Sequence, residues 1–478
     1  MISVNKVKKA FARYKEIIPD WDDFIDSLTL PLPTSFWVNN LRVTPERIIE
    51  LFKKDGLKLT PVPWYAGAFR LKENFSLGNR LEFLTGLIHI QEEVALTAVK
   101  LLDPRPEERI LDLCAAPGNK TAQIAVLMQN RGTVIANDYN FDRLRAITRT
   151  VHRLGLVNVT ITAHNAINYP RNAGQFDKVL VDVPCSCEGT SRKNPEVLDQ
   201  INLEQSLKLS RLQTLILIRA LELCKTGGRV VYSTCTYAPE ENEMVVQKAL
   251  DSLVHKIEAE ILPVQIPDFK FCPGIPAWQD LRFRKDMINT MRIYPHQNNT
   301  GGFFVAMIRK NGDKKTHLQT NDSQNFLEFV DSSPWISILR ERFGFAEEIF
   351  EPYKFYKVNA RTICLILPDH LTVAKPLRQS AGLPLLRTTL KYPKLTTAGV
   401  LMFGQHARKN VLEVNKEQAY CYLRGAAFSV SGNLSLEEGY VILKFENIVL
   451  GIALYLNGKI ISLFPKAWWI KSHINSGG

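Results

Sequence analysis

Between residues 87 and 310 the chain alternates apolar runs with amphipathic stretches, and this alternation constrains the fold more than any other feature. The apolar runs include "RILDLCAA", "GTVIANDY", "NVTITAH", "DKVLVDV" and "GGRVVYSTC". Helix-like segments such as "DRLRAITRTVHRLG" and "LEQSLKLSRLQTLILIRALELC" separate them. Strands that alternate with helices form parallel sheets with helices on both faces. The sequence therefore predicts a doubly wound α/β core that binds ligands at the carboxyl ends of its strands.

The first strand-to-helix connection, "LDLCAAPGNKTA", has the features of a ligand-binding loop. Asp112 ends the strand, and Gly118 lies in the turn before a helix N-terminus, whose free N–H groups suit a carboxylate or phosphate. Asp138 ends the next strand, 20 residues after Gly118, where such folds place an acid that accepts hydrogen bonds from ribose hydroxyls. The loop lacks the GxGxxG of dinucleotide folds, which favours S-adenosylmethionine. The alternative is a tight turn without a ligand.

Two cysteines also stand at predicted strand ends, Cys185 in "VLVDVPCSCEGTSRKNP" and Cys235 in "GGRVVYSTCTYAPEENE". They could be ordinary core residues, or zinc ligands together with Cys187 and Cys114. With 8 cysteines in 478 residues and no CxxC pair, a disulfide scaffold is disfavoured. C-x-C with scattered partners is not a usual zinc spacing, so the sequence predicts no metal ion.

Covalent catalysis explains both cysteines. Carbon 5 of cytosine is a poor nucleophile, but a thiolate that adds to carbon 6 makes carbon 5 able to attack a sulfonium methyl group. Charge that develops at ring nitrogen 3 must be stabilised, and a second thiol can assist product release. Asp182, Cys185 and Cys235 supply these roles: Asp182 as ring contact or acid, Cys185 as release thiol and Cys235 as nucleophile. In "DVPC" a thiol replaces the aromatic residue of amino-group methyltransferase motifs, which favours carbon as the methyl acceptor.

A thiolate needs a lowered pKa, which the neighbouring cations Arg192 and Lys193 could supply. The alternative for this segment is a solvated basic loop. Both residues are also candidate RNA contacts, because cations that bind phosphate supply affinity without sequence information.

These motifs resemble the Nop/Sun (NSUN-like) family of RNA cytosine-5 methyltransferases. The matching runs, over residues 38–310, are "VNNLRV", "HIQEEVA", "LDLCAAPGNKT", "VDVPCSCEGTSRKNP", "GGRVVYSTCTYAPEENE" and "RIYPHQNNTGGFFVAMIRK". The resemblance implies a Rossmann-like class I methyltransferase core with Cys235 as nucleophile and Cys185 in product release. The cofactor contacts that it implies are Cys114, Ala115, Ala116, Pro117, Gly118, Asn119, Lys120, Asp138, Asn165 and Asp182.

Three residues depart from the family pattern. Asn119 replaces the usual glycine after "PG", and Asn165 replaces an acid that faces the adenine amino group. An asparagine carbonyl can still accept that hydrogen bond, so the second change bears on cofactor affinity rather than activity. Cys187 replaces the usual glycine after "PCS". Its bulk could alter the target pocket, and no role is assigned to it.

The flanking regions are expected to bind RNA. The C-terminal region resembles that of the bacterial RsmF-like group, which carries a PUA-like RNA-binding barrel, and Asn457-Gly458 predicts a hairpin turn within it. For Trp468-Trp469, core or interface packing is favoured over base stacking. A net charge of +12 fits a nucleic-acid partner. The expected parts are an N-terminal α+β extension (1–90), the methyltransferase core (91–312), a linker (313–330) and a β-rich region (331–478) with the PUA-like domain at about 385–478.

The sequence thus predicts an S-adenosylmethionine-dependent RNA methyltransferase that makes 5-methylcytosine in a structured RNA, with small-subunit ribosomal RNA favoured. Transfer RNA is the first alternative. A non-catalytic RNA-binding ribosome-assembly protein and a DNA cytosine methyltransferase are rivals from other classes. No apolar run approaches the length of a membrane span, and the N-terminus lacks a signal-peptide core. We therefore expect a cytoplasmic monomer that does not bind membranes.

Overall fold

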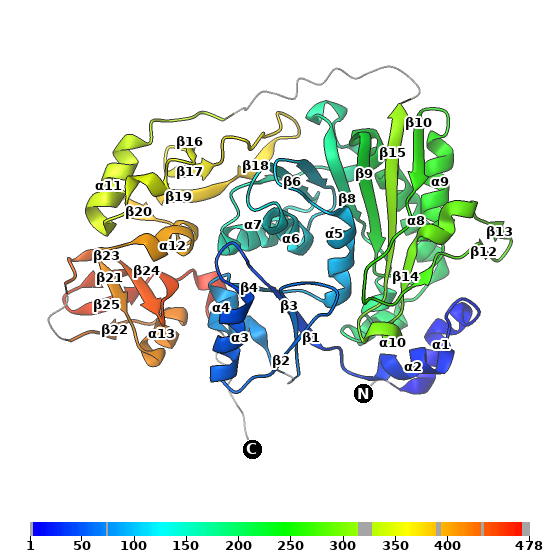
Figure 1. Ribbon diagram of the computed structural model, residues 1–478, viewed down its shortest axis with the longest axis horizontal. Coiled ribbons are helices and arrows are strands. Elements are labelled where there is room, and N and C mark those ends of the chain that lie inside the picture. Colours follow the sequence, from blue (N-terminus) through cyan, green and yellow to red (C-terminus); the bar gives the residue numbers. More distant parts are fainter. Residues whose placement is uncertain (1–2, 73–74, 314–326, 389–392, 432–434, 471–478) are drawn as a thin grey trace.

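The computed structural model describes residues 3–72, 75–313, 327–388, 393–431 and 435–470 (Figure 1). Most of the linker predicted at 313–330 lies outside these residues. The described chain forms one large central sheet with smaller sheets beside it. No helix within these ranges is long and apolar enough to cross a membrane.

The central sheet has ten strands in the order β11-β14-β15-β9-β8-β5-β6-β7-β18, with β10 paired to β15. The neighbours β9, β8, β5, β6 and β7 are parallel, which confirms the predicted doubly wound core. β15 runs antiparallel to β9, so the sheet is mixed. The strands are β5 (Arg109–Asp112), β6 (Thr133–Asn137), β7 (Val159–Thr162), β8 (Phe176–Asp182), β9 (Cys224–Thr234), β10 (Ile257–Ile261), β11 (Cys272–Pro273), β14 (Met291–Ile293), β15 (Phe303–Asp313) and β18 (Arg378–Ala381).

Helices cover both faces of this sheet (Figure 1). Successive strand side chains point to opposite faces, so Ile110 packs in one hydrophobic layer and Leu111 in the other. The first layer contains apolar residues of α5, α6 and α7, and the second contains those of α8 and α9. These helices are α5 (Leu96–Leu102), α6 (Asn119–Leu127), α7 (Phe141–Leu154), α8 (Leu203–Leu223) and α9 (Glu243–Leu253).

The N-terminal region contributes several helices and a small antiparallel sheet. Val7 of α1 and Phe24 of α2 pack in one cluster with Tyr237 and Tyr294, so these helices cover the segment that follows Cys235. The small sheet has the order β2-β3-β1-β4. Its strands and the helices of this region are α1 (Val4–Phe11), α2 (Trp21–Thr29), β1 (Thr34–Val38), α3 (Pro45–Lys54), β2 (Leu59–Pro61), β3 (Ala68–Leu71) and β4 (Ile88–Ile90).

The C-terminal region forms two further sheets, β16-β17-β19-β20 and β21-β23-β24-β25-β22. Asn457 and Gly458 both have positive φ (47° and 73°) between β24 and β25, which confirms the predicted hairpin turn. Their elements are α11 (Ser333–Phe343), β16 (Lys354–Asn359), β17 (Thr362–Ile366), β19 (Leu383–Arg387), β20 (Lys394–Leu395), α12 (Thr397–Phe403), β21 (Val411–Glu413), α13 (Lys416–Leu423), β22 (Phe428–Ser429), β23 (Gly439–Phe445), β24 (Ile448–Leu456) and β25 (Lys459–Ser462).

One strand of this region, β18, leaves it and pairs antiparallel with β7 of the central sheet. β7 would otherwise be an edge strand with unpaired backbone N–H and C=O groups, which β18 covers. The C-terminal region is therefore joined to the core through backbone hydrogen bonds, a connection that the sequence did not predict.

Candidate active site

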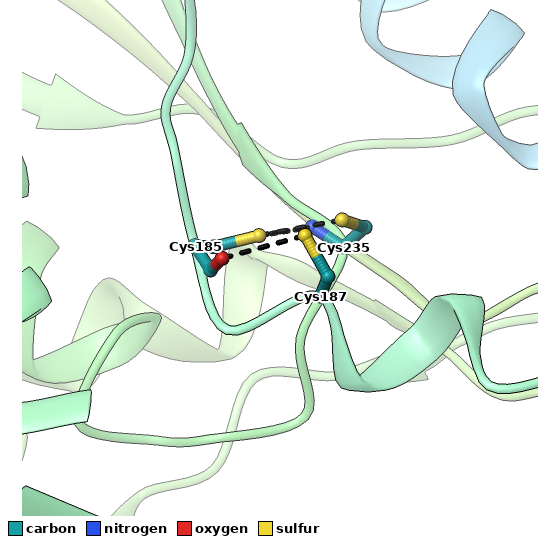
Figure 2. Close-up of side chains that lie close together, drawn as sticks. All are labelled: Cys185, Cys187 and Cys235. Carbon is teal, nitrogen blue, oxygen red and sulfur yellow. Dashed lines mark hydrogen bonds between the residues drawn. The ribbon is translucent and has the colours of Figure 1, made fainter. Parts of the chain in front are cut away.

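The two predicted catalytic cysteines meet at the carboxyl end of the central sheet (Figure 2). Cys185 follows β8 and Cys235 follows β9, and these strands are parallel neighbours, so their ends are adjacent. The two Sγ atoms are 3.3 Å apart, and the Cys235 N–H donates to Cys185 Sγ at 3.3 Å. Cys187 brings a third sulfur, and all three lie within 4.8 Å of one another.

A pair of glycines holds the Cys185 loop against the Cys235 segment. The Gly189 N–H donates to Cys235 O at 2.8 Å, and the Gly302 N–H donates to Gly189 O at 2.9 Å. A Cβ atom at Gly189 would lie 2.3 Å from Gly302 O, so a side chain at this position would push the two segments apart. The loop can therefore approach Cys235 only because residue 189 has no side chain.

The "PEENE" motif after Cys235 fixes both cysteine segments. Glu241 Oε2 accepts hydrogen bonds from the Ser186 N–H at 3.0 Å and from Gln213 Nε2 at 2.9 Å. Asn242 Oδ1 accepts from Thr234 Oγ1 at 2.6 Å. Glu241 and Asn242 are fully buried. The motif is one of the sequence runs that resemble the family, but the sequence predicts no role for it. In the structure it positions the residues beside Cys185 and Cys235.

The same motif corrects a predicted helix boundary. The pattern predicts a helix from Pro239, but α9 begins at Glu243. Glu240 instead accepts from Trp278 Nε1 at 2.9 Å, and Glu243 accepts from Arg292 Nε at 2.6 Å. Acidic residues favour a helix start in sequence patterns, but here the side chain of Glu240 bonds to another element and Glu240 lies before the helix.

The three thiols titrate as one group. Hydrogen bonds from Cys185 and Cys235 lower the pKa of the Cys187 thiol, whereas the hydrogen bond with Cys187 raises the pKa of Cys185. Cys187 Sγ also lies 3.4 Å from the carbonyl oxygen of Cys185, a contact that favours the protonated form of Cys187. The pKa of Cys235 is also raised, with the hydrogen bond with Cys187 and burial among the causes, so the three pKa values belong to the hydrogen-bonded group and not to separate thiols.

Asp182, the third predicted catalytic residue, is ion-paired. Its Oδ2 accepts from Lys120 Nζ at 2.6 Å and its Oδ1 from Ser233 Oγ at 2.7 Å. Burial lowers the pKa of Lys120, but the Asp182 carboxylate more than offsets this, and the pKa is raised. The sequence predicts Lys120 only as a cofactor contact, and its pair with Asp182 was not predicted. The signal was available, because Lys120 opens α6 just after β5, and β8 with Asp182 is the neighbour of β5.

A cavity of about 160 Å³ lies beside this ion pair and contains most of the predicted cofactor contacts. Gly118 shapes its loop: it has a φ of 101°, and a Cβ atom there would lie 3.0 Å from Ile147 Cα on α7. The lining residues are Ile90, Gln91, Glu92, Ala95, Asp112, Cys114, Ala115, Ala116, Pro117, Asn119, Lys120, Asp182 and Lys193.

Asp112 shows that this cavity suits a cationic ligand group. Its Oδ2 accepts from Thr121 Oγ1 at 2.6 Å, but its buried Oδ1 has no hydrogen-bond partner among the described residues. Burial raises the pKa of Asp112 to about 7. An ammonium group, such as the one on the methionine part of S-adenosylmethionine, would supply both the donor and the counter-charge, so the residues present fit this cofactor.

Besides Gly118, two predicted cofactor contacts, Asp138 and Asn165, lie outside this lining. Asp138 accepts from the Ala116 N–H at 3.2 Å and from the Asn140 N–H at 3.0 Å, so it supports the loop that borders the cavity. The exposed Asn165 accepts from the Ile167 N–H at 3.0 Å. Their assignment to the ribose and adenine of the cofactor stays a prediction.

The two candidate RNA contacts differ in position. Arg192 is buried, and its guanidinium donates to Pro31 O at 2.8 Å, Thr300 O at 2.9 Å and Asn299 Oδ1 at 2.7 Å. These bonds occupy its donors, so the side chain fastens loops together and is not available to phosphate. The cations whose charge acts on the thiols are Lys120, near Cys235, and Arg143, which lowers the pKa of Cys187. Lys193 is exposed at the rim of the cavity.

Known proteins match the chain along most of its length. The family described as "N-terminal domain of 16S rRNA methyltransferase RsmF" matches residues 8–93, "16S rRNA methyltransferase RsmB/F" matches 99–309, and "Methyltransferase RsmF PUA domain" matches 409–470. The chain is 28% identical over 456 residues to the ribosomal RNA small subunit methyltransferase F of Shewanella woodyi, which covers 93% of this chain and 92% of that protein.

Two relatives match about two-thirds of the chain. The tRNA (cytosine(49)-C(5))-methyltransferase of Pyrococcus abyssi is 35% identical over 305 residues, covering 63% of this chain and 96% of that protein. The crystal structure of a methyltransferase homolog from Pyrococcus horikoshii is 33% identical, with a TM-score of 0.57, over 64% of this chain and 98% of that chain. The chain therefore belongs to the RsmB/F family of S-adenosylmethionine-dependent RNA cytosine-5 methyltransferases.

Proposed function

We propose that this enzyme methylates carbon 5 of a cytosine in small-subunit ribosomal RNA through a covalent bond between Cys235 and the base. The contact between Cys185 Sγ and Cys235 Sγ, 3.3 Å long, is the observation that carries this proposal. It brings two thiols to one point beside an ion pair and a cavity that suits the cofactor, which is the set of groups that the reaction needs.

Adduct formation begins at Cys235. Its thiolate forms a bond to carbon 6, and the ring electrons move toward nitrogen 3, where a proton or positive charge stabilises them. The Asp182–Lys120 pair offers a carboxylate for the cytosine amino group and an ammonium for this developing charge. S-adenosylmethionine supplies the electrophilic methyl group. Because Asp182 is ion-paired, we assign it the role of hydrogen-bond acceptor rather than acid.

Product release needs the second thiol. After methylation, carbon 5 carries both a proton and the methyl group. When a base removes that proton, its bonding electrons form the C5–C6 double bond and the Cys235–C6 bond breaks, with sulfur leaving as thiolate. Cys185, whose Sγ lies 3.3 Å from Cys235 Sγ and accepts from the Cys235 N–H, is positioned to act as this base.

A cross-linking experiment tests this division of labour. We expect Cys185→Ala, incubated with RNA and S-adenosylmethionine, to accumulate a covalent protein–RNA complex, because the adduct forms but is not released. The double variant Cys185→Ala/Cys235→Ala should form none. A Cys185→Ala protein that turns over without cross-linking, or a cross-link that survives the loss of Cys235, would contradict the roles assigned here.

The choice of ribosomal RNA rests on the flanking regions. The small-subunit ribosomal RNA enzyme of Shewanella woodyi aligns with 93% of this chain and over 92% of its own length. The transfer RNA enzyme of Pyrococcus abyssi aligns with only 63% of this chain. Bisulfite sequencing of total RNA from cells with and without the gene tests this choice: one small-subunit cytosine should lose its methyl group. Loss at a transfer RNA position instead would favour the alternative substrate.

The other rivals have their own tests. Methyl incorporation into RNA but not duplex DNA would exclude DNA methylation, and any turnover would exclude a purely non-catalytic assembly factor. We infer that the enzyme acts in the cytoplasm, where ribosomal RNA lies in a bacterial cell, and as a monomer, since one chain supplies all the site residues described above.

A further inference from the structure

Cys187 is a third thiol in the active site that the proposed reaction does not use. Its backbone has a φ of 59°, a left-handed conformation that residues other than glycine, asparagine and aspartate seldom adopt. This conformation turns the side chain back toward Cys185, so that Cys187 Sγ contacts Cys185 O at 3.4 Å and lies beside the other two sulfurs (Figure 2). Unusual backbone geometry of this kind concentrates at functional sites.

The spacing of the sulfurs suits a thiolate-bound metal ion. Zinc–sulfur bonds are about 2.3 Å long, so two sulfurs on one tetrahedral zinc are roughly 3.8 Å apart. Cys185 and Cys235 are separated by 3.3 Å, and no two of the three sulfurs lie more than 4.8 Å apart. Small rotations of the side chains would therefore bring all three within bonding distance of a single ion.

The chemistry of the ligands selects the class of ion. All three ligand atoms are sulfur, and soft ligands favour Zn²⁺ and Cd²⁺ over Mg²⁺ or Ca²⁺. The cluster has three protein ligands, and each cysteine is partly exposed, so the fourth position is open to water or solute. Zinc sites that close all four positions with protein ligands are structural, whereas three-ligand sites exchange their fourth ligand.

We propose that Cys185, Cys187 and Cys235 form a binding site for one soft divalent cation, and that its occupation blocks methylation. Binding replaces the thiol protons, which pass to the buffer, with metal–sulfur bonds, and it needs no oxidant. The inhibitory part rests on the proposed function of Cys235: a sulfur whose lone pair is bound to the metal cannot add to carbon 6. Removal of the metal by a chelator should restore activity.

The sequence spacing argued against a zinc site, because C-x-C with a distant partner is unusual. The structure changes this interpretation, since β8 and β9 bring Cys235 to the C-x-C segment and the left-handed turn at residue 187 directs the third sulfur inward. Neither feature can be read from the spacing of the cysteines.

Cadmium titration of the full-length, reduced protein tests the site directly, because thiolate–Cd²⁺ bonds absorb in the ultraviolet. We expect one tight equivalent in the wild type. Cys187→Gly, which accepts positive φ without strain, should bind at least about 10-fold more weakly, and so should Cys187→Ser, which has a harder ligand atom. Cys421→Ser, which removes a partly exposed cysteine of α13, is the matched control and should bind like the wild type.

Equal affinity in the wild type and both Cys187 variants, or no charge-transfer absorption in the wild type, would overturn the proposal. The second readout is inhibition: Cd²⁺ should stop methylation by the wild type at a concentration at least about 10-fold lower than in Cys187→Gly, each measured against its own metal-free rate. If the protein binds Cd²⁺ tightly but methylates no RNA, the metal site is supported and the proposed function is refuted. Binding without inhibition would refute the inhibitory role.

Discussion

Asp112 allows the electrostatics of the cofactor cavity to be measured without RNA. Its carboxyl group is 1% exposed, and burial raises its pKa from 3.8 to about 7. Raising the pKa by about 3 corresponds to about 4 kcal/mol in the free energy of unfolding. The folded state holds this proton more tightly than the unfolded chain does. The stabilisation is therefore complete below about pH 4, falls as the pH rises, and is lost above about pH 7.

The variant Asp112→Asn removes this titration and keeps an oxygen that can accept from Thr121. We expect it to match the wild type in free energy of unfolding near pH 4 and to be up to about 4 kcal/mol more stable at about pH 8, without cofactor. The assay is urea unfolding followed by tryptophan fluorescence across this pH range. Glu188, whose pKa burial also raises to about 7, keeps its own pH dependence in both proteins, so the difference between the two curves isolates Asp112.

Cofactor binding should respond in the opposite direction. The unpartnered Oδ1 of Asp112 can receive an ammonium group, so we expect calorimetry to show weaker S-adenosylmethionine binding by Asp112→Asn, most clearly above about pH 7, where the wild-type carboxyl is ionised. If the free energy of unfolding changes with pH in the same way in both proteins, the cost assigned to burying the Asp112 carboxylate is refuted. Unchanged cofactor affinity would refute the assigned ammonium contact.

Two further predictions concern the supports of the cysteine loops. Gly189→Ala should abolish most methylation and reduce cross-linking to RNA, because its Cβ would meet Gly302 O at 2.3 Å, whereas Gly312→Ala, with nothing within 4 Å of its Cβ, should behave like the wild type in both assays. Glu243→Gln should lower the free energy of unfolding by about 3–5 kcal/mol, since it leaves the buried Arg292 without its counter-charge. Glu260→Gln, which breaks an exposed ion pair, is the control and should leave the urea midpoint nearly unchanged, and an equal loss in both variants would contradict the role of burial.

Sequence periodicity predicted the central sheet because its strands are buried on both faces and read as continuous apolar runs. The meeting of Cys185 and Cys235 followed from the same pattern, since both come directly after such runs in a parallel sheet. Strand β18 escaped prediction because "RQSA" has no apolar alternation, and it becomes a strand only where β7 offers an unpaired edge. Tertiary hydrogen bonding decided that element, and propensity did not.

The partners of the charged residues near the site were predicted less well than the strands, and the reason is the same for each residue. Arg192 and Lys193 are neighbours in the sequence with the same charge, yet Arg192 is directed into the protein by three carbonyl groups and Asn299, and Lys193 faces the cavity. Sequence shows that a cation is present but not which way its side chain turns. The ion pair of Lys120 with Asp182 was missed for the same reason, because the two residues are 62 positions apart in the sequence.

The "PEENE" motif illustrates why an active site of small, reactive side chains needs an extensive buried polar support. A thiol forms weak hydrogen bonds and cannot hold its own position. The chain instead buries Glu240, Glu241, Asn242 and Glu243 and bonds each of them to another segment, although one oxygen each of Glu240 and Glu241 has no partner among the described residues. Burying these groups is favourable only when the network is nearly complete, so a change in one of them shifts the others. Because Glu241 and Asn242 bond directly to Ser186 and Thr234, the neighbours of Cys185 and Cys235, variants at these two positions should lose methylation before they lose the fold, and the Cys185–Cys235 contact should be the first feature to change.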